Sequence, residues 1–189
     1  MRTADASVCL TVCVAVMSLM STAAAQHTPT AQMTDEQMIA SAMQAAPVSV
    51  AKEATIVAIE ADGKIRELRK GTNGFTCIPD NPESPGPDPM CGDKNAMEWA
   101  QAWIEHKPPP ANKVGFMYML AGGTDASNTD PYAASPQPGN NWVETGAHVM
   151  IVGAAKQMEG YPREAKPDTA QPYVMWAGTP YEHLMMPVK

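Results

Sequence analysis

Apolar residues recur at helical spacing in two segments of the chain, and both segments have recognisable ends. The first begins at Thr34, which has the spacing of a capping box with Gln37, and the pattern predicts a helix to about Ala46. The second runs from Asp93 to Lys107, with Asp93 as its N-cap and three prolines after its end. Apolar side chains cover one wide arc of this helix and charged ones the opposite arc, so we expect it to pack on a sheet.

Short runs of β-branched and apolar residues predict strands in the first half of the chain. Ala54 to Glu60 is the first of them, and Ala61-Asp62-Gly63 is a hairpin signal that leads into a return strand from Lys64 to Lys70. The return strand is charged and its apolar residues fall on opposite faces, which indicates a sheet edge, with a bulge as a candidate feature. A further turn leads into Phe75 to Ile78, so we expect a three-stranded meander.

The second half of the chain holds two segments that are apolar on both faces, as expected for central strands. These are Val114 to Leu120 and Ala147 to Val152. Tyr173 to Trp176 and His183 to Val188 have the character of closing strands. A long loop, Ala121 to Gly146, separates the two central strands, and structureless loops of that length inside a compact domain are often functional.

Composition supports a folded core and argues against one class of partner. The 189 residues are 44% hydrophobic and 17% charged, which permits one modest domain with a buried core. The chain has 13 basic and 20 acidic residues, and its formal net charge is −7. Because nucleic-acid binding usually needs an excess of Lys and Arg to displace counterions from phosphates, we expect no nucleic-acid partner.

The beginning of the chain has the pattern of an export signal. Arg2 precedes an apolar stretch from Val8 to Met20, and Ala23-Ala24-Ala25 precedes Gln26. The apolar stretch is shorter than the roughly 20 residues that cross a bilayer as a helix, and no later segment reaches that length without proline or charge. We expect cleavage after residue 25, a periplasmic or extracellular location and no membrane span after cleavage.

Cleavage at that point would leave two of the four cysteines, Cys77 and Cys91. In an oxidising compartment this pair is expected to form a disulfide, which closes a segment that holds five prolines and has little to pack. The alternative is a reactive thiol pair, but the spacing differs from the short CxxC redox motif. A disulfide would order a segment that cannot form regular structure.

These elements predict a single loop-rich α+β domain with a mainly antiparallel sheet, one or two packed helices and one disulfide. The expected organisation is a signal peptide at 1–25, a leader and N-terminal helix at 26–53, and a globular domain at 54–189.

A short pattern occurs twice, as His148-Val149-Met150 and as His183-Leu184-Met185, each within an expected strand. Strand alternation puts the histidine and methionine of each pair on the same face. If the two strands are neighbours, two imidazoles and two thioethers could converge, which is a ligand set that suits copper. The alternative is structural, because methionine fills irregular cores and a buried histidine usually bonds to backbone.

The long loop offers a second candidate ligand site, with oxygen ligands for a hard cation. Its sequence departs from a calcium loop, since residue 130 is Asp where glycine is required and residue 136 is Pro where glutamate must close the site. A turn-rich segment stabilised by Asx turns is the competing interpretation. The loop could also line a groove for a small apolar or sugar-like ligand, together with the aromatic residues Trp142, Tyr132, Tyr181 and Trp176. The candidate residues of this ligand loop are Asp125, Asn128, Asp130 and Tyr132.

The usual enzyme signatures, such as GxSxG, a Walker loop, GxGxxG and HExxH, are absent from the sequence. We therefore lean towards a binding protein without covalent catalysis, with copper or another small ligand as its partner. One alternative is a small hydrolase or isomerase in which His148 or His183 is the general base beside Asp125 or Asp130. The other is a structural envelope protein without a ligand.

Several longer segments carry a resemblance that covers roughly Ala54 onward. They are Asn73-Gly74-Phe75-Thr76-Cys77, Asp88-Pro89-Met90-Cys91, the run from Gly122 to Tyr132, His148-Val149-Met150-Ile151-Val152, and the run from Tyr173 to Tyr181. In these segments the chain resembles a family of uncharacterised exported bacterial proteins. The resemblance implies a bacterial, exported origin and brings no activity, cofactor or catalytic residue with it.

Overall fold

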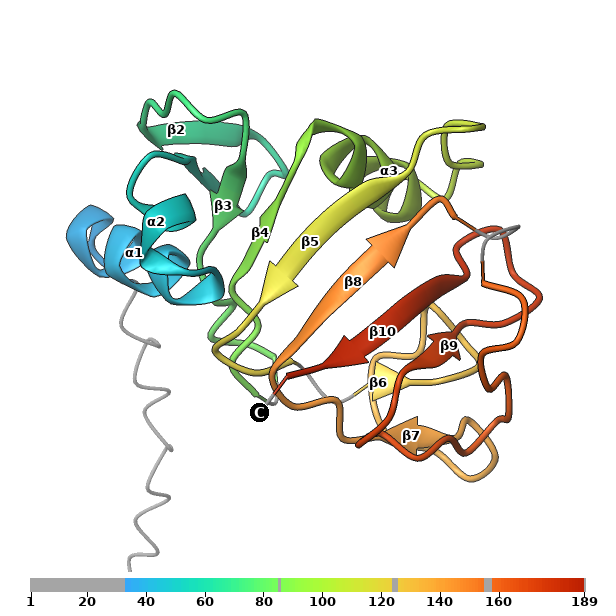
Figure 1. Ribbon diagram of the computed structural model, residues 1–189. Coiled ribbons are helices and arrows are strands. Elements are labelled where there is room, and N and C mark those ends of the chain that lie inside the picture. The colour runs from blue at the N-terminus through green and yellow to red at the C-terminus, as the bar shows by residue number, and fades with distance from the viewer. Residues whose placement is uncertain (1–32, 85, 124–125, 155–157, 189) are drawn as a thin grey trace, which may run out of the picture. The chain divides into compact units, whose positions relative to one another are not determined.

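An eight-stranded sheet forms the centre of the computed structural model (Figure 1), which describes residues 33–84, 86–123, 126–154 and 158–188. The strand order is β2-β1-β3-β4-β5-β8-β10-β9, and all neighbours are antiparallel except β1 and β3. The strands of this sheet are β1 (Thr55–Ile59), β2 (Ile65–Arg69), β3 (Thr76–Ile78), β4 (Met90–Gly92), β5 (Gly115–Met119), β8 (His148–Val152), β9 (Tyr173–Met175) and β10 (His183–Pro187). The expected signal peptide lies outside the described residues.

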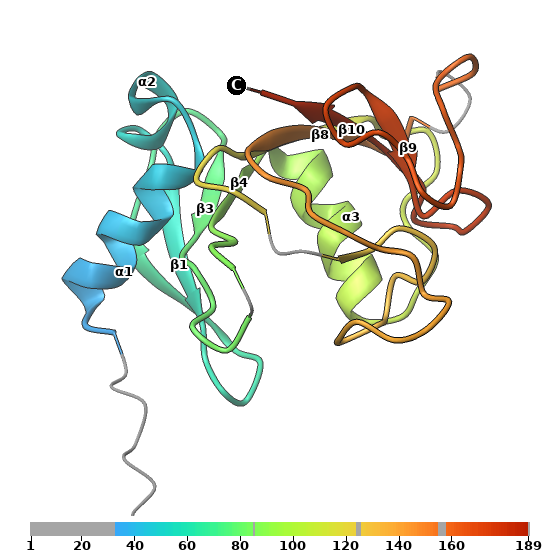
Figure 2. The same cartoon turned by 90° about the horizontal axis from the view of Figure 1, so that it is seen from below.

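Helices cover both faces of the sheet, and Figure 2 shows α1 and α2 on one side of β3 and β4 and α3 on the other. They are α1 (Asp35–Ala42), a 3₁₀ turn (Met43–Ala45), α2 (Val48–Ala51) and α3 (Lys94–Ile104). The arrangement confirms the predicted α+β fold with a mainly antiparallel sheet.

The N-terminal helix begins with the expected capping box between Thr34 and Gln37 but ends at Ala42, before the predicted end. The chain then tightens into the 3₁₀ turn, and Pro47 starts α2, a four-residue helix that the sequence pattern did not predict. Small alanines on these elements pack closely on the sheet around the disulfide. This cluster is formed by Ala42, Ala45, Ala46, Ala51, Ala54, Ile56, Cys77 and Cys91.

Helix α3 is capped by Asp93, whose carboxylate accepts the Ala96 N–H at 2.8 Å, as predicted. The helix ends at Ile104, three residues before the expected end at Lys107, because His106 adopts the left-handed conformation with φ 55°. The ring of His106 stacks on Tyr132, with 4.0 Å between ring centroids.

The first three strands do not form the predicted meander. Strand β3 pairs with β1 in parallel, on the side of β1 away from β2. The chain after β2 crosses the end of β1, where Gly71 lies so close to the backbone of Ala54 and Thr55 that a β-carbon would collide with it. The Thr55 N–H then donates to the Phe75 carbonyl at 2.9 Å, which sets the parallel register.

Strand β2 is the edge of the sheet and carries the expected bulge. Ile56 pairs with Arg69 and Val57 with Glu67, so Leu68 is the extra residue. The bulge allows Leu68 to pack against the core under α1 and α2, although strict alternation would have placed it on the other face.

The disulfide between Cys77 and Cys91 is present and joins residues that are directly paired on β3 and β4. It closes the proline-rich segment at its base, as the sequence predicted.

The loop between β5 and β8 is not wholly irregular, since it contains a two-stranded sheet of β6 (Ala126–Ser127) and β7 (Trp142–Val143). Among the helices of the described residues, none is long and apolar enough to cross a membrane.

Candidate metal-binding cavity

The two His-x-Met patterns lie on neighbouring strands, β8 and β10, and their side chains share one face of the sheet. The antiparallel register pairs Met150 directly with Met185. His183 pairs with Val152, four residues beyond His148, so the two histidine α-carbons are offset by roughly 13 Å along the strands. The methionines therefore lie at the centre, and the histidines lie at the two ends of the pair.

The outer strands place one more methionine beside each histidine. Met119 of β5 pairs with His148, and Met175 of β9 pairs with His183. Each imidazole thus has one methionine two residues along its own strand and another on the adjacent strand. No sequence pattern distinguishes Met119 and Met175 as candidate ligands, because a methionine in an apolar strand has the pattern of ordinary core.

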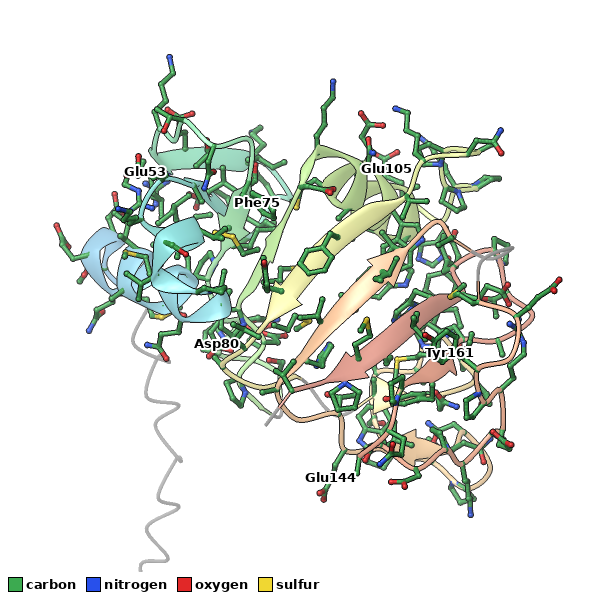
Figure 3. The ribbon with its side chains drawn as sticks, in the orientation of Figure 1. Glu53, Phe75, Asp80, Glu105, Glu144 and Tyr161 are labelled. Carbon is green, nitrogen blue, oxygen red and sulfur yellow. A yellow bond between two sulfur atoms is a disulfide. The ribbon has the colours of Figure 1, made fainter. Side chains whose placement is uncertain are left out.

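Helix α3 covers this face and leaves a cavity of about 150 Å³ between the helix and the sheet. Figure 2 shows α3 lying against the face formed by β8 and β10. We call this space the His–Met cavity, and its walls are formed by Met90, Met117, Met119, Met150, Met175, Met185, His148, His183, Trp99, Trp103, Trp176, Ala100, Ala126, Thr145 and Asp88. Charged side chains such as Glu105 and Glu144 lie at the periphery (Figure 3).

Both imidazoles are held by a backbone carbonyl two residues earlier in the chain. His148 Nδ1 lies 2.8 Å from the Gly146 carbonyl oxygen, and His183 Nδ1 lies 2.9 Å from that of Tyr181. A carbonyl can only accept, so Nδ1–H donates and the neutral ring keeps a lone pair on Nε2. These are the backbone bonds expected of a structural histidine, and they are also the bonds that orient a metal-binding one.

The Nε2 atom of His183 is buried and has no hydrogen-bond partner among the described residues. Burial lowers the pKa of His183 to about 4, and the nearby His148 contributes to the same shift. Burial also lowers the pKa of His148, against the opposing effect of its bond to the Gly146 carbonyl. Both rings are therefore neutral near pH 7, which is the state that binds a metal ion.

Two indole rings fix the orientation of His183. Its ring centroid lies 5.2 Å from that of Trp99 and 4.9 Å from that of Trp176, with nearly perpendicular planes. Trp176 is anchored in turn, because its Nε1–H donates to the Ser127 carbonyl at 2.8 Å. The Nε1 of Trp99 is the second buried polar atom of the cavity wall without a partner among the described residues.

The long loop approaches the other histidine through Gly123. A β-carbon at this position would lie 2.6 Å from Cε1 of His148 and would overlap the hydroxyl of Thr145. The absence of a side chain at Gly123 therefore lets the loop backbone pack directly on the imidazole.

Asn128, Asp130 and Tyr132, the described candidate residues of the ligand loop, do not line this cavity. Asn128 is buried and its side-chain amide donates to the Glu164 carbonyl at 2.9 Å, whereas Asp130 is exposed and accepts the Tyr132 N–H at 2.9 Å. The bond of Asp130 is the expected Asx turn. Asp125 lies outside the described residues, within which no group of three or more His, Cys, Asp or Glu side chains could hold a metal ion.

The expected aromatic groove is only partly assembled. Trp142 and Trp176 line a neighbouring hollow of about 270 Å³ together with Asp130, and Trp176 also belongs to the wall of the His–Met cavity, while Tyr132 and Tyr181 are not part of the wall of this hollow. The hydroxyl of Tyr181 donates instead to the Lys107 carbonyl at 2.9 Å.

The arrangement of a histidine general base beside a carboxylate is not found within the described part of the chain, where both imidazoles bond to backbone carbonyls. Asp88, the carboxylate in the cavity wall, accepts the Asn81 N–H at 2.9 Å.

Comparison of the chain with protein-family models, with curated proteins and with solved structures gave no match. The case for a function therefore depends on the geometry and chemistry of the His–Met cavity.

Proposed function

We propose that this chain is an exported copper-binding protein whose ligands are His148, Met150, His183 and Met185. The observation that carries the proposal is the β8–β10 register, which pairs the two methionines and puts both histidines on the same face of the sheet. Side chains that only fill a core need not include two imidazoles held in fixed orientations beside a pair of methionines.

The chemistry of the donors supports copper over other metals. Thioether sulfur is a soft ligand that favours Cu(I), and imidazole binds copper in either oxidation state. The sulfurs of Met150 and Met185 would form the centre of the site, with Nε2 of His148 and Nε2 of His183 as the donors at its two ends. Met119 and Met175 lie next to the histidines as further sulfur donors.

The size of the cavity supports an ion more than an organic ligand. Sites for small organic molecules usually have volumes of roughly 300–1,000 Å³. The His–Met cavity has about 150 Å³, which is enough for an ion or for a ligand of very few atoms.

Export is the second part of the proposal, and it is supported by the sequence at residues 1–25 and by the disulfide between Cys77 and Cys91. Disulfides persist in oxidising compartments such as the bacterial periplasm, and the use of thioethers in place of thiolates suits such a compartment, because thiols there tend to oxidise. Metal analysis of the protein purified from its native host before any chelator is added should give about one copper per chain.

Copper affinity is best tested by competition with a chromogenic Cu(I) chelator. Changing both histidines to Ala should reduce the copper affinity by at least about 100-fold, because loss of an outer-shell partner alone typically costs about 10–100-fold and these changes remove the donor atoms themselves. His106→Ala is the matched control, because His106 is exposed and stacks on Tyr132 outside the cavity.

A second pair of variants separates loss of donors from loss of folding. Met150→Leu with Met185→Leu removes two sulfurs at nearly constant volume, and Met158→Leu with Met186→Leu does the same in the cluster around Val174 and Leu184. Only the first pair should weaken copper binding. Unchanged copper affinity in both the double histidine and the Met150/Met185 variants would show that the cavity is ordinary core.

A further inference from the structure

The walls of the His–Met cavity carry almost no negative charge. The donors are thioethers and imidazoles, which stay neutral when they bind a metal. The one carboxylate in the wall belongs to Asp88, which also lines two neighbouring hollows, so it lies at the side where the cavity meets the surface. The other lining residues are apolar, aromatic or carry a hydroxyl.

The two histidines supply no compensating negative charge, because a neutral imidazole binds a metal ion as an uncharged donor. Their Nδ1–H groups are committed to the carbonyls of Gly146 and Tyr181, and Nε2 of His183 is buried without a partner within the described residues. An ion at the centre of this cavity would therefore be surrounded by neutral donors and mostly apolar walls, with the Asp88 carboxylate at one side.

The cost of such an arrangement depends steeply on the charge of the ion. In a medium of low polarity the desolvation cost rises with the square of the charge, so a divalent ion costs about four times as much as a monovalent ion of the same size. Sites for Zn²⁺ usually offset this cost with thiolate or carboxylate ligands. The His–Met cavity has neither among its central donors.

We infer that the His–Met cavity is selective for charge as well as for softness, and that it binds Cu(I) and Ag(I) while it excludes Cu(II) and Zn(II). This inference rests on the proposed function and names the form of the metal that the site accepts. Ag(I) is the most direct probe, because it shares the charge and ligand preference of Cu(I) and undergoes no redox change under the conditions of the experiment.

The experiment measures the binding of Ag(I), Cu(I), Cu(II) and Zn(II) to the chain as purified from its native host, each by competition with a chelator of known affinity and with native mass spectrometry for stoichiometry. Ag(I) and Cu(I) should bind at one per chain. Binding of Cu(II) and Zn(II) in the cavity should be weaker by at least about 100-fold, as expected for an uncompensated second charge.

A charge inserted into the wall tests the cause of the selectivity. Ala126→Asp adds a carboxylate to the cavity wall, and Ala134→Asp adds the same charge in the neighbouring hollow, outside the cavity. Ala126→Asp should reduce the ratio of Ag(I) affinity to Zn(II) affinity by about tenfold, whereas Ala134→Asp should leave this ratio unchanged.

The outcomes separate the inference from the proposed function. The charge selectivity would be overturned if the native protein bound Zn(II) with an affinity within tenfold of its Ag(I) affinity and the double histidine variant lost the Zn(II) binding. That result would leave a metal site in place. An equal change of the Ag(I)-to-Zn(II) affinity ratio in Ala126→Asp and Ala134→Asp would also overturn the charge selectivity. Failure of all four ions to bind would overturn the proposed function together with the inference.

Discussion

Replacing Gly123 by alanine perturbs the contact between the long loop and the cavity at a single point. The added methyl carbon would lie 2.6 Å from Cε1 and 3.0 Å from Nδ1 of His148, and it would also overlap the hydroxyl of Thr145. Real β-carbons do not tolerate such distances, so either the loop backbone or the imidazole must move. The backbone conformation of Gly123 lies outside the left-handed region, so steric overlap is the whole effect.

The expected cost has two parts. Overpacking in a well-packed interior costs about 1–3 kcal/mol, and rotation of the imidazole would also break its bond to the Gly146 carbonyl, worth about 0.5–1.5 kcal/mol. We therefore expect Gly123→Ala to lower the free energy of unfolding by about 2–4 kcal/mol. Because the same bond orients Nε2 of His148, copper affinity should fall by roughly 10–100-fold.

Urea unfolding of the metal-free protein measures the stability change, and chelator competition measures copper affinity. Gly86→Ala is the control, since its added carbon would meet only the Gly123 carbonyl oxygen, at 3.7 Å. That variant should be close to the native protein in both measurements. A Gly123→Ala variant as stable as Gly86→Ala would refute the proposed packing of the loop on His148.

Three further predictions concern stability. Replacing Cys77 and Cys91 by serine should cost about 3 kcal/mol in urea unfolding, because the disulfide closes a segment with a sequence separation of 14. Since burial lowers the pKa of His183 from 6.5 to about 4, the unfolded chain binds a proton between these values that the folded protein does not. The free energy of unfolding should therefore fall by about 3 kcal/mol from pH 6.5 to pH 4, and pH titration of His183→Asn should lack this component. Asp93→Ala should destabilise the protein by about 1–2 kcal/mol, whereas Asp93→Asn should retain most of the cap, as thermal unfolding of both variants would show.

Local features of the fold could be read from the sequence where one short pattern determines the outcome. The capping box at Thr34, the cap at Asp93 and the bulged edge strand all depend on residues within a few positions of one another. The parallel pairing of β1 and β3 depends instead on where the chain travels after Gly71, which no alternation pattern encodes. The four-residue helix α2 is too short to produce a periodic signal.

The candidate site, too, could be predicted from the sequence only in part. Alternation correctly puts His148 with Met150 and His183 with Met185 on shared faces, but it cannot say which residues lie opposite each other. The register that pairs the methionines and separates the histidines is a property of the β8–β10 pair, which alternation within one strand does not encode. The four further methionines of the wall could not be distinguished from core methionines before that order was known.

Keeping the His–Met cavity open costs packing energy, and that cost bears on its origin. At roughly 24 cal/mol per Å³, about 150 Å³ of fully enclosed empty space would cost about 3–4 kcal/mol, which is the upper bound for a cavity that meets the surface at one side. Methionine has three rotatable bonds and fills irregular gaps readily, so a wall with six methionines should collapse unless rigid groups hold it open. The rigid groups are the rings at its two ends: His148 is held by the Gly146 carbonyl, and His183 stands between Trp99 and Trp176. A hollow that is kept open by oriented imidazoles is explained more simply as a binding site than as a packing defect.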